Sequence, residues 1–422
     1  MSESFQGWRV LVVSANYAPE HAGIAPYSTG IAEHLADRGA RVDVLAAMPH
    51  YPAWRVHDDY RGRWRMVEWR GGVRVHRRRG YVPARQTAAR RAAYELSFLA
   101  HGSLRPPAGR PDVVLSQVPS LAGGLLGGRI ARRHGVPHIV VVQDLMGAAA
   151  AQSGIRGGGR AAALAAGAEA RVLRSAALVG VVHESFTDRV TAAGVSPARV
   201  RVVPNWTHAR SPSGERRAAR ARLGWAEGEC VLLHAGNMGL KQGLEVLIDT
   251  ARLAASRTPR TRIVLMGDGS RRAHLATLAA DVPNVDLLPP AADAEFADVL
   301  AAADVLVVTQ RASVLDMSLP SKLTSYFASG RPVVASVDPT GGTADEVRRS
   351  GAGVVVRPED PEALYGAARA LAEDPGRAAA LGARGPAYVR ERLSRQAGLG
   401  RMTALLAEAM AGEAPVVGLS ES

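Results

Sequence analysis

The stretch that decides the fold of this 422-residue chain reads Leu319-Pro320-Ser321-Lys322-Leu323 and, a few residues later, Gly330-Arg331-Pro332-Val333-Val334. Pro320 sets a turn, Ser321 is a typical helix N-cap, and the glycine of the second segment is a typical helix stop. The apolar residues directly after this stop predict a strand buried in a parallel sheet. Lys322 adds positive charge at a helix start, where free N–H groups already favour an anion. The stretch therefore predicts an α/β fold with an anion site at the start of a helix.

Lysine is almost absent from this basic chain. Of its 52 Lys and Arg residues, only Lys241 and Lys322 are lysine. Lys241 also follows a predicted strand, in the glycine-punctuated turn 236–243. Because a compact ammonium differs from a guanidinium in what it binds well, the two lysines predict a nucleotide diphosphate held from two sides. The alternative is that a biased composition left two lysines by chance.

Predicted strands and helices alternate along the whole chain, twice over. Short runs rich in Val, Leu and Ile indicate strands buried on both faces of a parallel sheet, and longer segments between them indicate helices. We expect strands in the first half at 10–15, 42–47, 73–77, 113–117, 139–143, 178–182 and 200–204, and in the second half at 231–235, 262–267, 285–288, 305–309, 333–336 and 354–357. This pattern predicts two Rossmann-like, doubly wound domains that face each other across a cleft, with ligands at the carboxyl ends of the strands.

A Pro-, Ser- and Gly-rich segment at 204–214 separates the two halves and has the composition of an interdomain linker. We therefore expect one α/β domain at 1–208 and a second at 209–385. The remaining segment, 386–422, is predicted to form a helix that packs back on the N-terminal domain, followed by a tail.

The composition is that of a globular protein, with 47% hydrophobic and 22% charged residues. The single cysteine, Cys230, rules out an internal disulfide, and its place at the start of an apolar run favours a core position. The sequence shows neither a signal-peptide pattern nor an apolar stretch that could span a membrane. We expect a cytoplasmic protein.

The net charge of +13 is concentrated in the segment Arg61–Arg91, where eleven arginines face a single acid, Glu68. Aromatic residues accompany them: Trp54 just before the segment, and Trp64, Trp69 and Tyr81 within it. The segment is either a solvated arginine-rich surface or a face that docks on the anionic lipids of the inner membrane surface. Nucleic-acid binding is not expected, because no known nucleic-acid module accompanies the charge.

Polar residues follow several strands of the first half. His21 and Gly23 follow the first strand, His50 and Tyr51 follow the second, and Asp144 follows the strand at 139–143. Gly23 permits close approach of a ligand, and the other four are candidates for binding or orienting hydroxyl groups. Asp144 could equally be a helix N-cap. The dinucleotide motif G-x-G-x-x-G is absent after the first strand, which argues against an oxidoreductase.

In the second half, small residues surround the two lysines. The candidate donor-binding residues there are Asn237, Gly239, Gln242, Asp268, Gly269, Ser321, Ser325 and Glu346. Their glycine-rich turns precede helices, which is where phosphate groups bind. Asp268 could instead serve only as a turn residue.

The chain resembles retaining GT-B glycosyltransferases of glycosyltransferase family 4, in particular the exopolysaccharide branch that includes colanic acid biosynthesis enzymes. The matching pieces, in order, are 17–20 with 23–24, 49–52, 143–145, 204–206, 236–239 with 242–245, 267–269, 320–323 and 330–334. The resemblance implies the GT-B fold and transfer of a sugar, with retention, from a nucleotide diphospho-sugar to an acceptor hydroxyl. It also implies acceptor binding by the domain at 1–208 and nucleotide-sugar donor binding by the domain at 209–385. Catalytic roles are expected for Asp144, Lys241 and Lys322, a donor contact from Gly23, and acceptor contacts from His21, His50 and Tyr51.

The chain departs from the family pattern at four positions. The two family glutamates fall at Met317 and Ser325, and the usual Arg and Lys of the glycine loop fall at Asn237 and Gln242. Lys241, one residue away, could replace the lost charge. We interpret these departures as features of the branch rather than as loss of activity.

These observations predict a hexosyltransferase-type enzyme (EC 2.4) that uses a lipid-linked saccharide acceptor at the inner membrane face, needs no metal or other cofactor, and docks through Arg61–Arg91. Three alternatives stay open: the same chemistry on a soluble natural product or small sugar, a sugar-nucleotide 2-epimerase, and a non-enzymatic binding protein. The sequence does not identify the nucleotide base, the sugar or the linkage.

Overall fold

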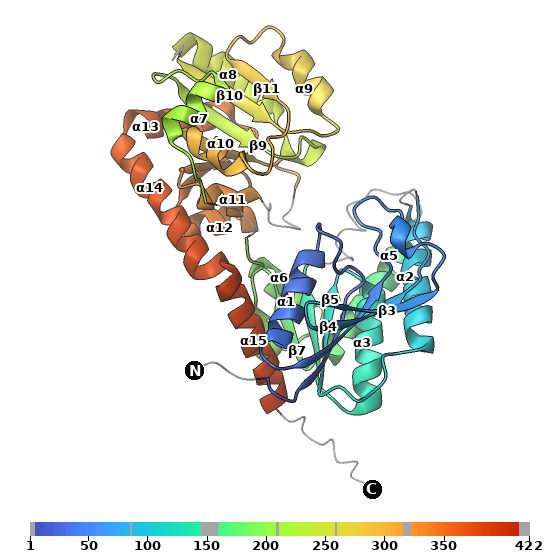
Figure 1. Cartoon of the computed structure of the whole chain (residues 1–422). Coiled ribbons are helices and arrows are strands. Elements are labelled where there is room, and N and C mark those ends of the chain that lie inside the picture. The colour runs from blue at the N-terminus through green and yellow to red at the C-terminus, as the bar shows by residue number, and fades with distance from the viewer. Residues whose placement is uncertain are drawn as a thin grey trace. The chain divides into compact units, whose positions relative to one another are not determined.

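The N-terminal half of the chain folds around one eight-stranded sheet (Figure 1). In the computed structural model, the described residues are 5–84, 87–144, 159–207, 211–257, 260–314 and 322–412. The strand order is β3-β4-β2-β1-β5-β6-β7-β8, and every neighbouring pair is parallel except β3 with β4. The strands are β1 (Arg9–Val13), β2 (Arg41–Ala47), β3 (Arg65–Arg70), β4 (Val73–Arg78), β5 (Val113–Val118), β6 (His138–Val142), β7 (Leu178–Val181) and β8 (Val200–Val202).

Helices cover this sheet. They are α1 (Ala25–Asp37), α2 (Ala88–Leu104), α3 (Leu121–His134), α5 (Gly159–Ser175) and α6 (Ser185–Ala192). Phe98 of α2 and Leu126 of α3 pack with Leu11, Val13 and Leu45 of the sheet in one buried cluster. One face of the sheet is thus closed by α2 and α3, and the carboxyl ends of the strands are left to the connecting loops.

The edge strand β3 was not expected from the sequence. Its side chains alternate between exposed and half-buried along Arg65–Arg70, and it pairs antiparallel with β4. Val67 and Trp69 lie on the exposed side and are 55% and 71% exposed. Because β3 has water on one face and carries arginines, it lacks the continuous apolar run that marks the buried parallel strands.

The second half contains a six-stranded parallel sheet with the order β11-β10-β9-β12-β13-β14, which confirms the second predicted α/β domain. Its strands are β9 (Cys230–Ala235), β10 (Thr261–Met266), β11 (Val285–Leu288), β12 (Val305–Thr309), β13 (Val333–Ser336) and β14 (Gly353–Val356). Its helices are α7 (Arg216–Leu223), α8 (Glu245–Arg257), α9 (Arg272–Ala279), α10 (Phe296–Ala302), α11 (Lys322–Ala328), α12 (Gly342–Ser350), α13 (Pro361–Glu373) and α14 (Pro375–Tyr388). Buried clusters fill both faces of this sheet.

The chain divides into two units, Met1–Asn205 with Gly398–Ser422, and Trp206–Ala397. The second unit therefore continues past residue 385, where the sequence had suggested a boundary. The last helix, α15 (Arg395–Ala411), belongs to the first unit from Gly398 onward. There Glu408 pairs with Arg201, and Thr403 lies 3.4 Å from the ring of His34. None of the helices in the described part of the chain has the length and apolar character needed to cross a membrane.

Candidate functional site

A buried carboxylate joins the loops that follow β1 and β2. Glu20 is 4% exposed. It accepts hydrogen bonds from the backbone N–H groups of His50 (2.7 Å), Tyr51 (2.8 Å) and Tyr17 (3.2 Å), and from the side-chain amide of Asn16 (3.0 Å). Hydrogen bonds to an ionised acceptor are about twice as strong as neutral ones. Glu20 therefore holds the predicted acceptor residues His50 and Tyr51 in place, a role that sequence reasoning missed.

One ring nitrogen of His50 has no hydrogen-bond partner among the described residues. Its Nδ1 donates to the carbonyl of Met48 over 2.8 Å, which leaves Nε2 as an acceptor. The side chain is 1% exposed, and Nε2 has no hydrogen-bond partner among the residues that the structure describes. Burial lowers the pKa of His50, and the nearby carboxylate of Glu20 opposes this shift without cancelling it. His50 is thus neutral at pH 7 and can accept a hydrogen bond from a hydroxyl group.

Aromatic rings surround His50. The ring of Trp54 lies 5.6 Å and that of Tyr94 lies 5.3 Å from the imidazole. The guanidinium of Arg91 lies over Trp54 at 4.9 Å and over Tyr94 at 5.2 Å. Trp54 has a left-handed backbone with φ of 51°, which is unusual for a bulky residue and is typically found where function requires it. Trp54 and Arg91 are therefore further candidates for acceptor contacts.

The loop of His21 and Gly23 lies against Tyr51. His21 is exposed, and Gly23 has φ of +64°. A Cβ on Gly23 would lie 3.0 Å from Cε1 of Tyr51. The structure thus brings Gly23 next to a predicted acceptor residue, although Gly23 itself had been predicted to contact the donor.

We expect Gly23→Ala to weaken acceptor binding. Alanine would place a Cβ on a residue with a left-handed backbone, and this Cβ would push the ring of Tyr51 away. Together these effects should cost about 1 to 2 kcal/mol of binding free energy. The KM of the acceptor should rise roughly tenfold while nucleotide affinity stays unchanged. Steady-state kinetics with isothermal titration of the nucleotide checks this, with Gly7→Ala as the control, because Gly7 also has positive φ and nothing lies within 4 Å of its Cβ position. An unchanged acceptor KM would contradict the assignment.

A chain of side-chain amides crosses the carboxyl ends of β5, β6 and β8. Asn205 donates to Gln143 over 2.6 Å, and Gln143 donates to Gln117 over 3.1 Å. Asp144, the predicted catalytic carboxylate, directly follows Gln143 and is half-buried. Its position at this edge of the sheet is as expected, and its role stays a prediction.

In the second unit, the loops after β9 and β10 are held together by backbone hydrogen bonds. The N–H of Met238 donates to the carbonyl of Asp268 over 2.8 Å, and the N–H of Arg271 donates to the carbonyl of Met238 over 2.9 Å. Gly269 has φ of +154°, and a Cβ there would lie 2.6 Å from the carbonyl oxygen of Met238. Only glycine fits this close approach, which aligns the two loops at the carboxyl edge of the sheet.

Lys322, the first residue of α11, reaches this loop cluster. Its Nζ lies 3.2 Å from Nε2 of the buried His234, and a Cβ on Gly236 would lie 3.3 Å from the same Nζ. Burial lowers the pKa of Lys322 to about 8, and burial together with Lys322 lowers the pKa of His234. Among the described residues no carboxylate pairs with Lys322, and burial is the only cause of its lowered pKa. A partly buried ammonium without a counter-ion favours binding of an anion.

The other predicted donor residues differ in their surroundings. Lys241 is exposed, in a short turn at Leu240–Gln242 that belongs to the loop Lys322 touches. Gln242 accepts a hydrogen bond from the N–H of Gly239 over 3.1 Å, so its side chain shapes this turn. Asp268 is exposed and accepts from the N–H of Gly269 over 2.7 Å, which fits the simpler role of a turn residue.

Of three further predicted positions, Glu346 and Ser325 lie on helices and Asn237 lies within the loop cluster. Glu346 is 7% exposed and accepts a hydrogen bond from the hydroxyl of Tyr388 over 2.9 Å. Ser325 is half-buried on α11, and Asn237 is exposed in the loop after β9, with its Oδ1 beside the Cβ position of Gly269 at 2.8 Å. Ser321 and Met317 lie outside the described residues. Donor contacts from these residues stay predictions.

Comparison with known proteins agrees with this architecture. Residues 22–206 match the family model described as glycosyl transferase 4-like domain, and residues 229–374 match the model described as glycosyl transferases group 1. The colanic acid biosynthesis glycosyl transferase WcaI of Escherichia coli (strain K12) is 29% identical over 374 residues, covering 86% of this chain and 91% of that protein. D-inositol 3-phosphate glycosyltransferase 1 of Catenulispora acidiphila is 29% identical over 380 residues, covering 85% of this chain and 84% of that protein.

A solved structure shows the same fold. The Anabaena protein Alr3699/HepE, in complex with UDP, matches with a TM-score of 0.67 and 16% identity, over 95% of this chain and 100% of that chain. The two domain matches, the relatives that span most of the chain and the pair of parallel-sheet units together show that this chain belongs to the GT-B glycosyltransferases, with a glycosyl transferase 4-like domain followed by a glycosyl transferases group 1 domain.

Proposed function

We propose that this glycosyltransferase moves a hexose, with retention of configuration, from a nucleotide diphospho-sugar to a hydroxyl of a lipid-linked saccharide in cell-surface polysaccharide synthesis. The observation that carries the proposal is the ammonium of Lys322, which lies against Gly236 with no carboxylate partner among the described residues. The UDP bound to the Anabaena neighbour and the colanic acid assignment of the E. coli relative support the donor and acceptor classes.

The proposed reaction begins at the donor. The bond between C1 of the sugar and the β-phosphate oxygen breaks, and its electron pair leaves with the phosphate. Lys322 and Lys241 stabilise the negative charge that develops there, together with the backbone N–H groups of the glycine loops. The sugar becomes oxocarbenium-like, as in glycosidases.

The acceptor completes the exchange on the same face of the sugar. A bond forms between the acceptor oxygen and C1, and the proton of the reacting hydroxyl passes to the departing phosphate. A strong protein base is therefore not required. Neutral His50 orients the acceptor by accepting a hydrogen bond from one of its other hydroxyl groups through Nε2, and Asp144 and Tyr51 supply further contacts.

The proposal can be tested by thermal denaturation with UDP-, GDP- and dTDP-linked compounds, in EDTA. A nucleotide that binds the native state at 100 times its Kd stabilises that state by about 2.7 kcal/mol, which raises the Tm of a unit of this size by roughly 5 to 10 °C. We expect one nucleotide class to give this shift and turnover to persist in EDTA, because transfer is proposed to need no metal. Absence of any shift across the panel, or restoration of turnover only by added metal, would contradict the proposal.

The lipid-linked acceptor is supported by the exposed surface of the segment Arg61–Arg91. Trp64 is 65% exposed, with the guanidinium of Arg79 at 5.1 Å from its ring, and Tyr81 is 44% exposed. Aromatic rings and arginines together suit the interface of an anionic bilayer. Flotation with vesicles tests this part: we expect recovery with anionic vesicles and much less with neutral ones, and equal recovery would count against it.

A soluble acceptor is the second candidate, favoured by the D-inositol 3-phosphate glycosyltransferase among the relatives. Transfer to a small sugar or inositol phosphate at a rate above that to lipid-linked saccharides would support it. Conversion of the donor without acceptor and without nucleotide release would instead support a 2-epimerase.

A further inference from the structure

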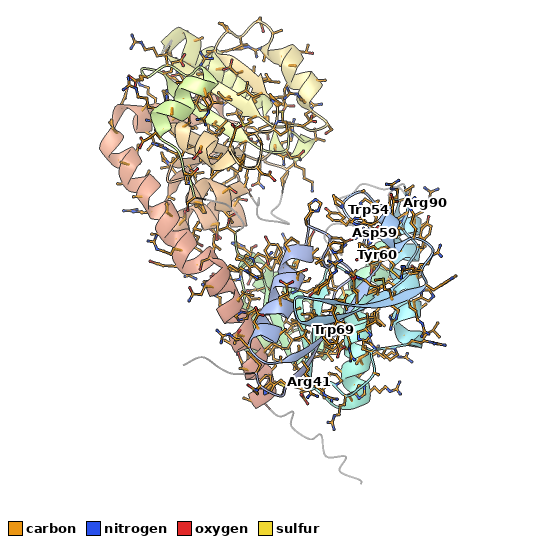
Figure 2. All side chains as sticks on the ribbon, viewed as in Figure 1. Arg41, Trp54, Asp59, Tyr60, Trp69 and Arg90 are labelled. Atoms are coloured by element: carbon orange, nitrogen blue, oxygen red, sulfur yellow. The ribbon has the colours of Figure 1, made fainter. Side chains whose placement is uncertain are left out.

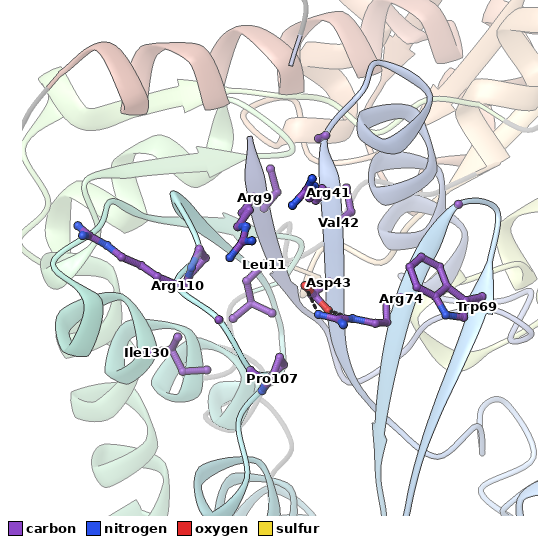
Figure 3. Close-up of a pocket in the computed structure, with 16 residues that line it drawn as sticks. Arg9, Leu11, Arg41, Val42, Asp43, Trp69, Arg74, Pro107, Arg110 and Ile130 are labelled. Atoms are coloured by element: carbon purple, nitrogen blue, oxygen red, sulfur yellow. Dashed lines mark hydrogen bonds and ion pairs between the residues drawn. The ribbon is translucent and has the colours of Figure 1, made fainter. Parts of the chain in front are cut away.

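A pocket of about 500 Å³ lies at the opposite edge of the first sheet from the loops described above (Figure 3). Its floor is formed by the first residues of β1 and β2 with the neighbouring part of the β3–β4 hairpin, and its wall by the loop 107–111. This volume is within the range of small-molecule sites. Arg41 at this edge and Trp54 at the other lie at opposite ends of the unit (Figure 2). β2 runs between the two edges over seven residues, which spans roughly 20 Å.

Four of the lining residues are arginines. Arg9 and Arg41 begin neighbouring strands in direct register, and Arg74 stands one strand further along the sheet. The only acid in the lining, Asp43, is already engaged: it accepts from Nε and Nη2 of Arg74 over 2.6 and 3.1 Å, and it lies 2.6 Å from Nε2 of His76. These hydrogen bonds lower the pKa of Asp43 despite its partial burial, so it stays ionised.

Arg9 and Arg41 are exposed, and their guanidinium groups are open to an anionic ligand. No carboxylate in the described residues pairs with either guanidinium; Asp112 accepts only from the backbone N–H of Arg9, over 2.7 Å. The closest atom to a Cβ built on Gly109 is Nη1 of Arg9, at 3.4 Å, so this side chain lies along the wall of the pocket. Arg110 also lines the pocket, but its side chain extends away from Arg9 and Arg41 in Figure 3.

The pocket also offers an apolar, flat surface beside this charge. Trp69 of the edge strand β3 stands directly opposite Arg74 in the antiparallel pair and is 71% exposed. Pro107, Pro111 and Ile130 line the other side. A guanidinium pair recognises a phosphate or carboxylate through parallel N–H donors, and an exposed indole provides a face for a ring.

We propose that this pocket is a second, non-catalytic site that binds a saccharide bearing a phosphate or carboxylate group. Arg9 and Arg41 hold the anionic group, Asp43 fixes Arg74 at the rim, and Trp69 covers the sugar ring. The site does not depend on the proposed reaction, because none of these residues belongs to the loops assigned to the donor or the acceptor. It gives the enzyme a place to hold an anionic glycan away from the position of transfer.

Tryptophan fluorescence of the full chain tests the site in the absence of nucleotide, with the variant Lys322→Met to detect any binding at the proposed donor loops. The probes are glucose 6-phosphate, glucuronate, glucose and inorganic phosphate. We expect saturable quenching by glucose 6-phosphate or glucuronate, and about tenfold weaker binding of glucose and of inorganic phosphate. The tighter of the two anionic sugars identifies whether the natural group is a phosphate or a carboxylate.

Variants test whether the anionic sugar binds in this pocket. Arg9→Ala/Arg41→Ala should weaken the anionic sugar by about tenfold or more, and Trp69→Phe should remove most of the quenching. Arg133→Ala is the matched control, because it removes an exposed arginine of the same unit outside the pocket. Circular dichroism checks that each variant is folded, and titration calorimetry measures affinity where the fluorescence signal is lost.

Three results would overturn the proposal. The first is equal affinity in the double variant and in Arg133→Ala. The second is binding of inorganic phosphate as tight as that of the sugar phosphate, because the ring would then contribute nothing. The third is loss of the signal in Lys322→Met but not in Arg9→Ala/Arg41→Ala, which would place the ligand in the second unit.

Discussion

Lys322→Met is expected to abolish sugar transfer while making the ligand-free protein more stable. Burial holds the pKa of Lys322 at about 8, against an ordinary value of 10.5, so the charged form costs the folded state about 3 kcal/mol at neutral pH. Methionine fills a similar volume without that cost. Transfer should nevertheless fall by about 10² to 10³, because the departing phosphate loses an ammonium that its developing charge requires.

The pH dependence of the unfolding free energy is an independent test of the buried charge. Between the folded pKa of about 8 and the unfolded value of 10.5, the unfolded chain binds the proton and the folded chain has released it. The contribution of this group to stability therefore rises with pH across that window and is lowest below pH 8. Urea denaturation at pH 7 and pH 10 should show that the difference in unfolding free energy between Lys322→Met and the parent shrinks as the pH rises.

The matched control for this prediction is Lys241→Met. Lys241→Met removes the other lysine, which is exposed, and should change the unfolding free energy by less than about 0.5 kcal/mol. If Lys322→Met transferred sugar at a rate close to that of the parent, the assignment of Lys322 to the leaving phosphate would be wrong. If the variant were less stable at pH 7, the contact of Nζ with Nε2 of His234 would contribute more to stability than burial of the charge costs.

The fold could be predicted because its signals are local. A strand buried on both faces, such as β10 or β12, contains a continuous run of apolar residues, and in β10 Gly267 follows this run directly. The loops that carry polar residues follow these strands directly, so the positions of His50 and Lys322 at the carboxyl edges could also be inferred. The signal failed at β3, where exposure to water replaces the apolar run with alternating arginine and aromatic residues.

The internal organisation of the sites could not be predicted in the same way. Glu20 binds residues 30 and 31 positions away, and Lys322 lies beside a histidine 88 positions away. These residues are far apart in the sequence, and they become neighbours only because β1 pairs with β2 and because α11 starts beside the end of β9. The unusual backbone of Trp54 likewise depends on packing that a single sequence does not reveal. The sequence identified which loops meet, and the structure identified which atoms hold them.

Glu20→Gln is expected to disrupt the acceptor side of the enzyme and to leave the donor side intact. The carboxylate accepts from four donors, and an amide can satisfy only those that face its oxygen. The remaining N–H groups would be buried against an NH₂ group, which costs about 3 kcal/mol in total. The loop of His50 and Tyr51 would then no longer hold the acceptor, and transfer should fall by roughly 10².

The matched control is Glu95→Gln, which changes another buried carboxylate of the same unit. Glu95 accepts from only two donors, the hydroxyl of Ser120 and the N–H of Ala122, and burial raises its pKa, so a neutral amide replaces it at a smaller cost of about 1 kcal/mol. Urea denaturation gives both costs, and nucleotide-induced stabilisation reports on the second unit. A Glu20→Gln protein that is destabilised but still transfers sugar with the acceptor KM of the parent would mean that Glu20 supports only the fold. Because the donor loops are built from Trp206–Ala397, a loss of nucleotide binding in this variant would show instead that the two sets of loops are not independent.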